Sequence, residues 1–233
     1  MKKFLEGYKR EDVIQFVGGN NNIGVELGVA EGVFGQHMIN SSKFLSMIGI
    51  DTYSELPHDT NEYKNTLLKL GLHSKYRILR MSFDEALDLF EDESLDFIYI
   101  DGYAHSGENG GKTIFDWYKK VKTGGVIAGD DYDHSWPLVI ESVNEFIAQS
   151  GLELMLTNIK GGDPYSQYPS WCVIKSFKRN IDLPSELYSK GVKENARVLR
   201  ARKKWRHVRC LKNLLISKIP SRYKRIIKKI FRM

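Results

Sequence analysis

The sequence has little cysteine and no long apolar run. Its two cysteines, Cys172 and Cys210, lie far apart and show none of the spacings of zinc sites. This excludes a disulfide-stapled secreted domain and a cysteine-based zinc centre, and it predicts a reduced, cytoplasmic setting. No stretch of about eighteen apolar residues occurs, and the first residues contain no apolar core. We therefore expect neither a membrane-spanning helix nor a signal peptide.

Acidic residues are almost absent from the last quarter of the chain. Of its 233 residues, those up to 175 include 16 lysines and arginines and 26 acids, a net charge of −10. Residues 176–233 include 19 basic residues and 3 acids, a net charge of +16. The overall charge of +6 therefore hides an acidic body and a basic tail. The length fits one domain with an appendage, which we place at residues 1–177 and 178–233.

Two short apolar runs, each closed by acids and glycines, organise the body. They are Leu95–Gly102 and Gly124–Tyr132, and both are typical of strands buried on both faces. Between them, Thr113–Val121 has apolar residues at helical spacing. This succession implies a parallel sheet covered by helices. The predicted fold is a Rossmann-like, doubly wound α/β sheet, mostly parallel, closed by antiparallel strands at 153–157 and 171–175.

The same patterns predict the remaining elements. We expect helices over Lys2–Phe16, Thr60–Leu70 and Phe83–Phe90, strands over Phe44–Ile50 and Tyr76–Met81, and a helix that begins at Trp136-Pro137. Ser82 and Glu85 have the spacing of a capping box, which favours a structural role for Ser82.

Three acids follow the two central strands, namely Asp101, Asp130 and Asp131. In parallel sheets, ligands collect beyond the carboxyl ends of the strands. Carboxylates that converge there repel one another unless a cation neutralises them, and an all-oxygen set suits Mg²⁺ before Ca²⁺ or Mn²⁺. The pattern predicts a metal site. The alternative for Asp130-Asp131 is a pair that caps a helix.

A glycine-rich turn follows the first predicted strand. Its spacing, Glu26-x-Gly28-x-x-x-Gly32, differs from the Gly-x-Gly-x-x-Gly of dinucleotide-binding proteins, which counts against a nicotinamide-dependent oxidoreductase. Such a turn lets a ligand approach the backbone, although glycines at a turn also serve packing. Asp51 ends the next strand, where it can accept hydrogen bonds from ribose hydroxyls or cap a turn.

The tail combines basic residues with an apolar stripe. The stripe recurs at intervals of three and four and is interrupted by Pro220; its members are Val198, Ala201, Trp205, Val208, Leu211, Leu215 and Ile219. Helices docked on the body or on a second subunit of a homo-oligomer would explain it. A basic helix lying on an anionic membrane surface, peripheral at the inner membrane, would also explain it. The acidic body and the lack of a binding motif argue against nucleic acid as a partner.

Together these motifs resemble the class I S-adenosylmethionine-dependent methyltransferases. The likeness is closest to the metal-assisted O-methyltransferase group that includes macrocin O-methyltransferase and the cephalosporin-hydroxylase-like proteins. It covers roughly residues 23–175 and rests on four segments: Val25–Gly32, Gly49–Asp51, Leu95–Gly102 with His105, and Gly124–Tyr132. Relatives often carry the histidine three residues after the aspartate, whereas His105 stands four residues after Asp101.

The resemblance implies S-adenosylmethionine and Mg²⁺ as cofactors. It places Glu26 near the methionine end of S-adenosylmethionine, Asp51 at the ribose, and Met81-Ser82 beside the adenine. The implied cofactor-binding residues are Glu26, Gly28, Ala30, Gly32, Asp51, Thr52, Met81, Ser82 and Asp101. The implied metal ligands are Asp101, Asp130 and Asp131.

Methyl transfer from a sulfonium needs an oxyanion and an in-line approach. A divalent cation lowers the pKa of a bound hydroxyl, and a histidine that takes the proton contributes typically ~10²–10⁴-fold. We expect His105 to be this base and Asp130 to act with it, with His134 as the second candidate or a surface residue. The predicted function is O-methylation of a small molecule or glycan. The alternative is an inactive cofactor-binding scaffold tethered to membrane or RNA by the tail.

Overall fold

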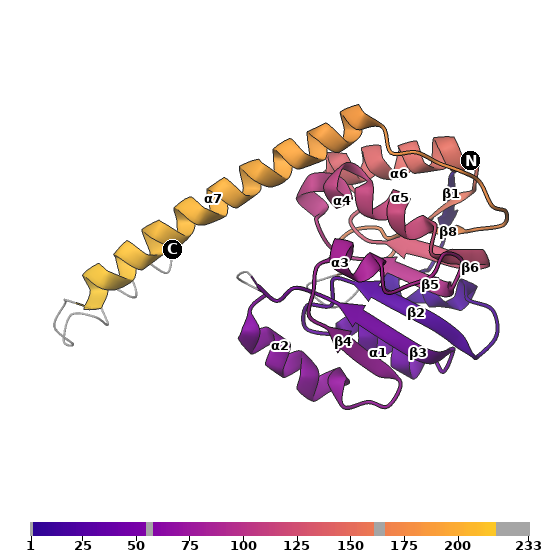
Figure 1. Cartoon of the computed structure of the whole chain (residues 1–233), viewed down its shortest axis with the longest axis horizontal. Coiled ribbons are helices and arrows are strands. Elements are labelled where there is room, and N and C mark those ends of the chain that lie inside the picture. The colour runs from indigo at the N-terminus through magenta and orange to yellow at the C-terminus, as the bar shows by residue number, and fades with distance from the viewer. Residues whose placement is uncertain (1, 55–57, 161–165, 218–233) are drawn as a thin grey trace. The chain divides into compact units, whose positions relative to one another are not determined.

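A computed structural model describes residues 2–54, 58–160 and 166–217 of the chain. The chain divides into two compact units, Met1–Val192 and Lys193–Met233. Within the described residues of the first unit, eight strands form one sheet in the order β1-β7-β8-β6-β5-β2-β3-β4 (Figure 1). The strands are β1 (Lys2–Leu5), β2 (Asn22–Leu27), β3 (Phe44–Ile50), β4 (Tyr76–Leu79), β5 (Leu95–Ile100), β6 (Val121–Gly129), β7 (Leu154–Thr157) and β8 (Trp171–Ile174).

The direction of the strands confirms the predicted fold class. Neighbouring strands are parallel except at β8, which runs antiparallel to both β6 and β7. The central strands read as continuous apolar runs because helices cover both faces of the sheet. The described helices are η1 (Arg10–Phe16), α1 (Val33–Asn40), α2 (Thr60–Thr66), η2 (Leu67–Gly71), α3 (Phe83–Leu87), η3 (Ala104–Ser106), α4 (Gly107–Gly110), α5 (Lys112–Tyr118), α6 (Pro137–Ser150) and α7 (Ser185–Ser217).

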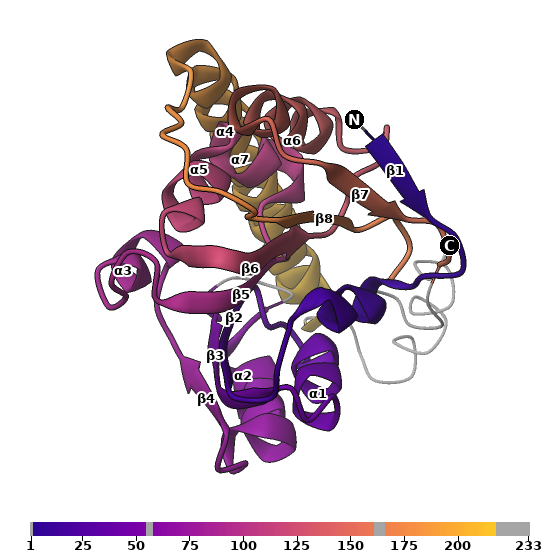
Figure 2. The ribbon, with the colours of Figure 1, turned by 90° about the vertical axis from the view of Figure 1, so that its right-hand side faces the viewer.

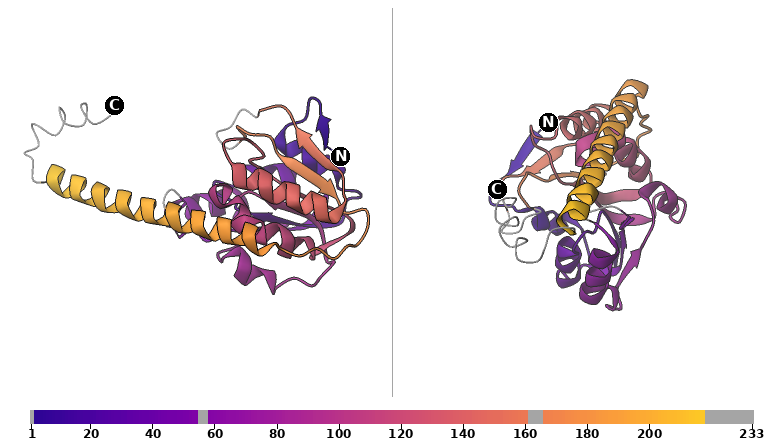
Figure 3. Two further views of the ribbon diagram at one scale, coloured as in Figure 1. Left: turned by 90° about the horizontal axis from the view of Figure 1, so that it is seen from above. Right: turned by 90° about the vertical axis from the view of Figure 1, so that its left-hand side faces the viewer.

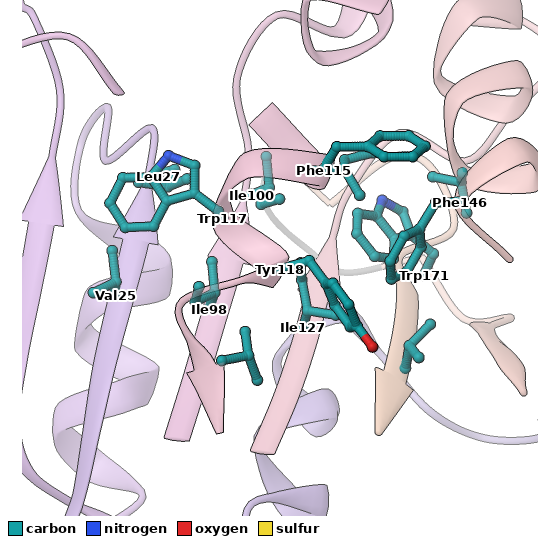
Figure 4. Packing of buried hydrophobic residues seen from close by; sticks show 14 of the residues in the cluster. Val25, Leu27, Ile98, Ile100, Phe115, Trp117, Tyr118, Ile127, Phe146 and Trp171 are labelled. Carbon is teal, nitrogen blue, oxygen red and sulfur yellow. The ribbon is translucent and has the colours of Figure 1, made fainter. Parts of the chain in front are cut away.

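Two apolar layers hold the sheet between these helices. One layer receives side chains from α3, α5 and α6, and the other from η1, α1 and η2. Figure 2 shows α5 and α6 on one side of the sheet and α1 on the other. In the first layer, Trp117 and Tyr118 of α5 and Phe146 of α6 lie against β2, β5, β6 and β8 (Figure 4). Fully burying one such aromatic side chain contributes about 1.5–3 kcal/mol. The two layers therefore fix the strand ends on which the site described below is built.

The first residues correct one prediction. The expected helix over Lys2–Phe16 is wrong in its first half, because Lys2–Leu5 forms the edge strand β1, parallel to β7. Only Arg10–Phe16 is helical, as the 3₁₀ helix η1. Lys2, Lys3 and Phe4 are exposed and Leu5 is buried, a composition that suits an edge strand guarded by lysines. Pairing with a strand some 150 residues away outweighed the local pattern.

A left-handed turn, labelled α4, follows β5. Five consecutive residues, Gly107–Gly111, have positive φ, including the non-glycine residues Glu108 (55°) and Asn109 (54°). A Cβ atom on Gly107 would lie 2.2 Å from the Leu138 carbonyl oxygen, so only glycine fits between this turn and α6. Left-handed backbone costs a non-glycine residue roughly 1–2 kcal/mol. Strain of this kind concentrates at functional sites.

The tail begins as one continuous helix, α7, which passes from the first compact unit into the second (Figure 3). Ile181 and Leu187 are buried in the first unit. The predicted apolar stripe falls on α7 as far as Leu215, whereas Ile219 and Pro220 lie outside the described residues. No helix in the described part of the chain has an apolar stretch long enough to cross a membrane.

Candidate active site

The carboxyl ends of four adjacent parallel strands form one edge of the sheet. Gly28, Asp51, Asp101 and Asp130 each directly follow one of the strands β2, β3, β5 and β6. The amides of Gly28, Asp101 and Asp130 donate to carbonyls at the ends of neighbouring strands over 2.9, 2.7 and 3.1 Å. The sheet pairing therefore continues one residue beyond each strand. It brings together predicted residues that are up to about a hundred positions apart.

Asp51 shapes the glycine-rich loop after β2. Its Oδ2 accepts hydrogen bonds from the backbone amides of Val29 (3.0 Å) and Ala30 (3.2 Å), and its Oδ1 accepts one from the amide of Tyr53 (3.0 Å). The turn-capping alternative for Asp51 is therefore correct. A carboxylate has about four acceptor positions, so this role still leaves room for a ligand hydroxyl.

The same loop is held from its other side by residues that the sequence patterns did not single out. The carbonyl of Ala30, whose φ is 44°, accepts hydrogen bonds from the Tyr53 hydroxyl (2.9 Å) and from Thr66 Oγ1 (2.7 Å). Tyr53 is buried, and burial raises the pKa of its hydroxyl, which stays a donor. The backbone amides of Val29 and Ala30 and the carbonyl of Ala30 are thus held in place by hydrogen bonds within the protein itself.

Packing accounts for both predicted loop glycines. Gly28 has a φ of +94°, and a Cβ atom there would lie 2.0 Å from the carbonyl oxygen of Asp101. Gly32 has a φ of +75° and precedes α1, where a Cβ atom would lie 2.5 Å from Leu70 Cδ1. The packing alternative stated above therefore applies to these two positions. A cofactor-binding role for their backbone stays a prediction.

Glu26 lies beneath the loop, inside the layer that contains η1 and α1. It is 1% exposed, and Tyr76 donates its hydroxyl hydrogen to Glu26 Oε2 over 2.5 Å. Burial raises the pKa of Glu26 to about 8, although the Tyr76 hydrogen bond and the charge of Arg10 act in the opposite direction. A buried acid of this kind is a candidate functional group because its environment sets its protonation near neutral pH.

The three acids after β5 and β6, which we call the acid cluster (Asp101, Asp130 and Asp131), meet an arginine. Arg10 Nη1 lies 3.0 Å from Asp101 Oδ2 and 3.2 Å from Asp130 Oδ2. Arg10 is only 4% exposed, and its guanidinium lies over the rings of Phe34 (5.2 Å) and Tyr99 (5.6 Å). The cation that the acids require is therefore supplied by the chain.

Burial and mutual repulsion raise the pKa values within the acid cluster. Burial and then the charge of Asp101 raise the pKa of Asp130 to about 7, with Arg10 and a hydrogen bond from Ser170 opposing. Burial and the charges of Asp130 and Asp101 raise the pKa of Asp131 to about 8. Burial by itself would lower the pKa of Arg10. The interactions with Tyr99, Asp101 and Asp130 outweigh this effect, so the pKa of Arg10 is raised.

The structure does not support the predicted metal site. Within the residues that are described, no group of three or more histidine, cysteine, aspartate or glutamate side chains could hold a metal ion. Arg10 instead contacts one carboxylate oxygen of Asp101 and one of Asp130. A bound metal ion would need these same two oxygens as ligands. Asp130 and Asp131 do not cap α6 either, since its N-cap residue is Trp136.

A buried hydrogen-bond chain fixes the orientation of Asp130. Ser170 Oγ donates to Asp130 Oδ1 over 2.9 Å, and the Tyr99 hydroxyl lies 3.1 Å from the same Ser170 Oγ. The Ser170 amide donates to Thr157 Oγ1 over 2.9 Å. Asp130 is therefore held on one oxygen by Ser170, directly before β8, and on the other by Arg10 of η1.

Comparison with known proteins agrees with this geometry. Residues 23–132 match the family model of a methyltransferase domain. A stretch of 131 residues is 34% identical to an uncharacterized protein of Acanthamoeba polyphaga mimivirus, and it covers 53% of this chain and 58% of that protein. This chain thus matches less than two thirds of the relative's length. Residues 23–132, which match the family model, contain the loop, Asp51 and the acid cluster.

Two solved structures show the same fold at low identity. A Methanococcus maripaludis protein described as an S-adenosylmethionine-dependent methyltransferase has a TM-score of 0.54 and 15% identity, over 73% of this chain and 85% of its own. This chain has the fold of a class I methyltransferase. Spermidine synthase of Thermotoga maritima, also at 0.54 and 15%, covers 81% of this chain and 71% of its own. The fold is thus shared with a synthase, and the macrocin O-methyltransferase group stays a prediction.

The two histidines predicted as candidate bases, His105 and His134, are both exposed. His105 lies in η3, directly before the left-handed turn, and its ring meets the edge of Trp136 at 4.5 Å between centroids. Trp136 in turn contacts Tyr168 at 5.9 Å. His134 lies in the turn between β6 and α6, and its exposure agrees with the surface-residue alternative. His105 is thus the one whose ring packs against an aromatic side chain.

The residues predicted at the adenine end divide into two kinds. Ser82 caps α3, since its Oγ accepts from the amide of Glu85 (3.2 Å) and Glu85 Oε2 accepts from the Ser82 amide (2.8 Å). The predicted capping box is confirmed. The carbonyl of Thr52 accepts a hydrogen bond from Arg80 Nε (3.1 Å), and Met81 packs on the apolar layer of α3. Cofactor contacts of Thr52 and Met81 stay predictions.

Glu108 and Trp136 each have a buried polar atom that lacks a hydrogen-bond partner in the part of the chain that the structure describes. Among the described residues such atoms are Glu93 Oε1, Glu108 Oε2 and Trp136 Nε1, and the first lies 3.6 Å from Lys175 Nζ. Glu108 is 3% exposed, and burial together with the charges of Asp131 and Asp101 raises its pKa well above the usual range. A neutral carboxyl can donate and accept, and an indole N–H can donate.

Proposed function

We propose that this protein transfers the methyl group of S-adenosylmethionine to a hydroxyl oxygen of a neutral small molecule or sugar. The observation that carries the proposal is the loop of the methyltransferase domain, which Asp51 holds at the end of β3 beside the acid cluster. A loop that is ordered before binding lowers the entropy cost of binding a cofactor. Asp51 keeps free acceptor capacity for the ribose hydroxyls.

The charge of the site favours this cofactor. The sulfonium of S-adenosylmethionine is positive, and a positive charge beside the acid cluster would lower the raised pKa values of Asp130 and Asp131 and so favour their ionised forms, which attract it. The same acids repel phosphates and other anions, which argues for an uncharged acceptor. The two polar atoms without partners, on Glu108 and Trp136, suit an acceptor that carries hydroxyl groups.

The transfer proposed here breaks the S–CH₃ bond and forms an O–CH₃ bond. The sulfonium becomes a neutral thioether, and the acceptor hydroxyl gives its proton to a base. We assign this base to His105, which stands between the left-handed turn and Trp136. Its ring carries one nitrogen that can accept a proton at neutral pH. No step is assigned to a metal ion.

The first test is calorimetric titration of S-adenosylmethionine into the wild type and into Asp51→Asn. The amide keeps one oxygen for the loop but loses the charge, so we expect weaker binding by roughly tenfold. Asp88→Asn, at an exposed acid directly after α3, is the matched control and should bind as the wild type does. Absence of binding to the wild type would refute the proposal.

The second test is transfer of a labelled methyl group to a panel of glycosides and polyols. We expect transfer by the wild type and a loss of about 10²–10⁴-fold in kcat for His105→Gln. An inactive scaffold is the second candidate, favoured by the Arg10 ion pairs in the acid cluster. It predicts cofactor binding without transfer to any member of the panel.

A further inference from the structure

The ion pairs of Arg10 have no counterpart in the predicted site. Arg10 lies in η1, before residues 23–132 that match the methyltransferase domain, and reaches partners 91 and 120 positions later in the chain. Its Nη1 contacts Asp101 Oδ2 and Asp130 Oδ2 over 3.0 and 3.2 Å. One guanidinium nitrogen thus stands between the two acids that the family resemblance assigns to a metal.

A divalent cation and this guanidinium would compete for the same place. Both would bind the same two carboxylate oxygens, and each carries positive charge, so they would repel each other at contact distance. Arginine cannot vacate the site by losing its proton, because its pKa lies far above neutral pH and the charges around it raise this pKa further. The rings of Phe34 and Tyr99 add cation–π attraction to the same guanidinium.

The backbone of Arg10 is also fixed. Val13 and Ile14 of η1 are buried in the apolar layer that contains α1. At the start of η1, the amide of Lys9 donates to Asp12 Oδ2 over 2.8 Å. A charged group on a buried, capped helix keeps its position better than one on a loop. Arg10 is therefore a built part of the edge at which β5 and β6 end.

We propose that Arg10 is the resident cation of the acid cluster and takes the place of a divalent metal ion. It is a positioning residue, since it holds the carboxylates of Asp101 and Asp130 and neutralises part of their charge. The consequence for catalysis, that methyl transfer proceeds without a metal ion, rests on the function proposed above. The cation-binding claim does not rest on it.

The test is calorimetric titration of Mn²⁺ and thermal unfolding with and without millimolar Mg²⁺. Both are done on the full chain, as wild type, Asp130→Asn, Arg10→Lys, Arg10→Gln and Arg10→Gln/Asp130→Asn. We expect that neither the wild type nor Arg10→Lys binds Mn²⁺ at the acid cluster, so that Asp130→Asn does not change the Mn²⁺ titration. Arg10→Gln should lose stability and gain Mn²⁺ binding. At about 100 times its Kd the ion would raise the Tm by several degrees. The double variant should bind no cation.

Two results would overturn the proposal. One is Mn²⁺ binding to the wild type that Asp130→Asn abolishes, and this comparison is decisive even if Arg10→Gln does not fold. The other is an Arg10→Gln protein that folds with unchanged stability and binds no cation. S-adenosylmethionine titration of the same proteins separates the two proposals. If the cation titrations contradict the role of Arg10 but the protein binds S-adenosylmethionine, the proposed function still holds. If metal-free protein does not bind S-adenosylmethionine, that result contradicts the proposed function but not the role of Arg10.

Discussion

Glu26 allows a sharp test of the electrostatics beneath the loop. Burial raises its pKa from 4.5 to about 8. Between these values the native state holds a proton that the unfolded state has lost. The free energy of unfolding therefore falls as pH rises, by about 1.4 kcal/mol per pH unit. The stabilising contribution of neutral Glu26 is complete below the unfolded pKa and is lost as pH passes through the folded pKa. The whole loss is on the order of 5 kcal/mol.

Glu26→Gln removes this proton linkage and keeps the shape of the side chain. Its amide oxygen can still accept the hydrogen bond of the Tyr76 hydroxyl. We expect the variant to gain stability relative to the wild type by about 3 kcal/mol as the pH rises from roughly 5 to 7.5. The carboxyl groups of Asp130 and Asp131 titrate in both proteins, so their contributions to the pH dependence largely cancel in the difference.

The assay is urea unfolding followed by far-UV circular dichroism at several pH values and constant ionic strength. The control is Glu6→Gln, at an exposed position of the same chain, for which the difference from wild type should not change with pH. A difference for Glu26→Gln that is flat with pH would refute a neutral Glu26. A difference of the opposite slope would mean that Arg10 outweighs burial and keeps Glu26 ionised.

Three further predictions concern a glycine, a buried acid and the basic tail. Gly28→Ala should cost at least about 3 kcal/mol in urea unfolding, since its Cβ would lie 2.0 Å from a carbonyl oxygen. Gly124→Ala, at a φ of +88° but in open space, should cost only about 1–2 kcal/mol, and equal costs would refute the clash. Glu108→Met should be as stable as the wild type or up to about 1–3 kcal/mol more stable, because it removes a buried oxygen without a partner. A clear destabilisation would assign Glu108 a structural role. The basic tail should sediment with phosphatidylserine vesicles at low salt and separate from them at high salt, whereas tail helices docked on protein would leave the chain in the supernatant.

The sequence predicted best where local patterns and tertiary packing agree. Phe44–Ile50 is a strand at both of its predicted ends, because an apolar run between turn residues needs no distant partner to be recognised. The Ser82 capping box was predictable for the same reason, since it is a contact between residues three positions apart. The edge strand β1 could not be predicted in this way, because it forms by pairing with β7, whose residues lie about 150 positions later in the chain. The left-handed turn had a signal in its three glycines, but the close approach of Gly107 to α6 and of Gly110 to α7 depends on the tertiary fold.

The acid cluster shows the limit of such predictions in physical terms. Three carboxylates at one strand edge need positive charge, and this requirement follows from the sequence alone. The identity of the charge does not follow from it. A metal ion is not encoded as a residue of the sequence. An arginine is, but because most arginines are exposed, the sequence alone does not indicate which one the fold buries. Arg10 stands outside the segment matched to the methyltransferase domain, so a comparison confined to residues 23–132 contains the acids without their partner. Burial of a charged residue near an acidic strand edge is therefore a better guide to the resident cation than the number of acids.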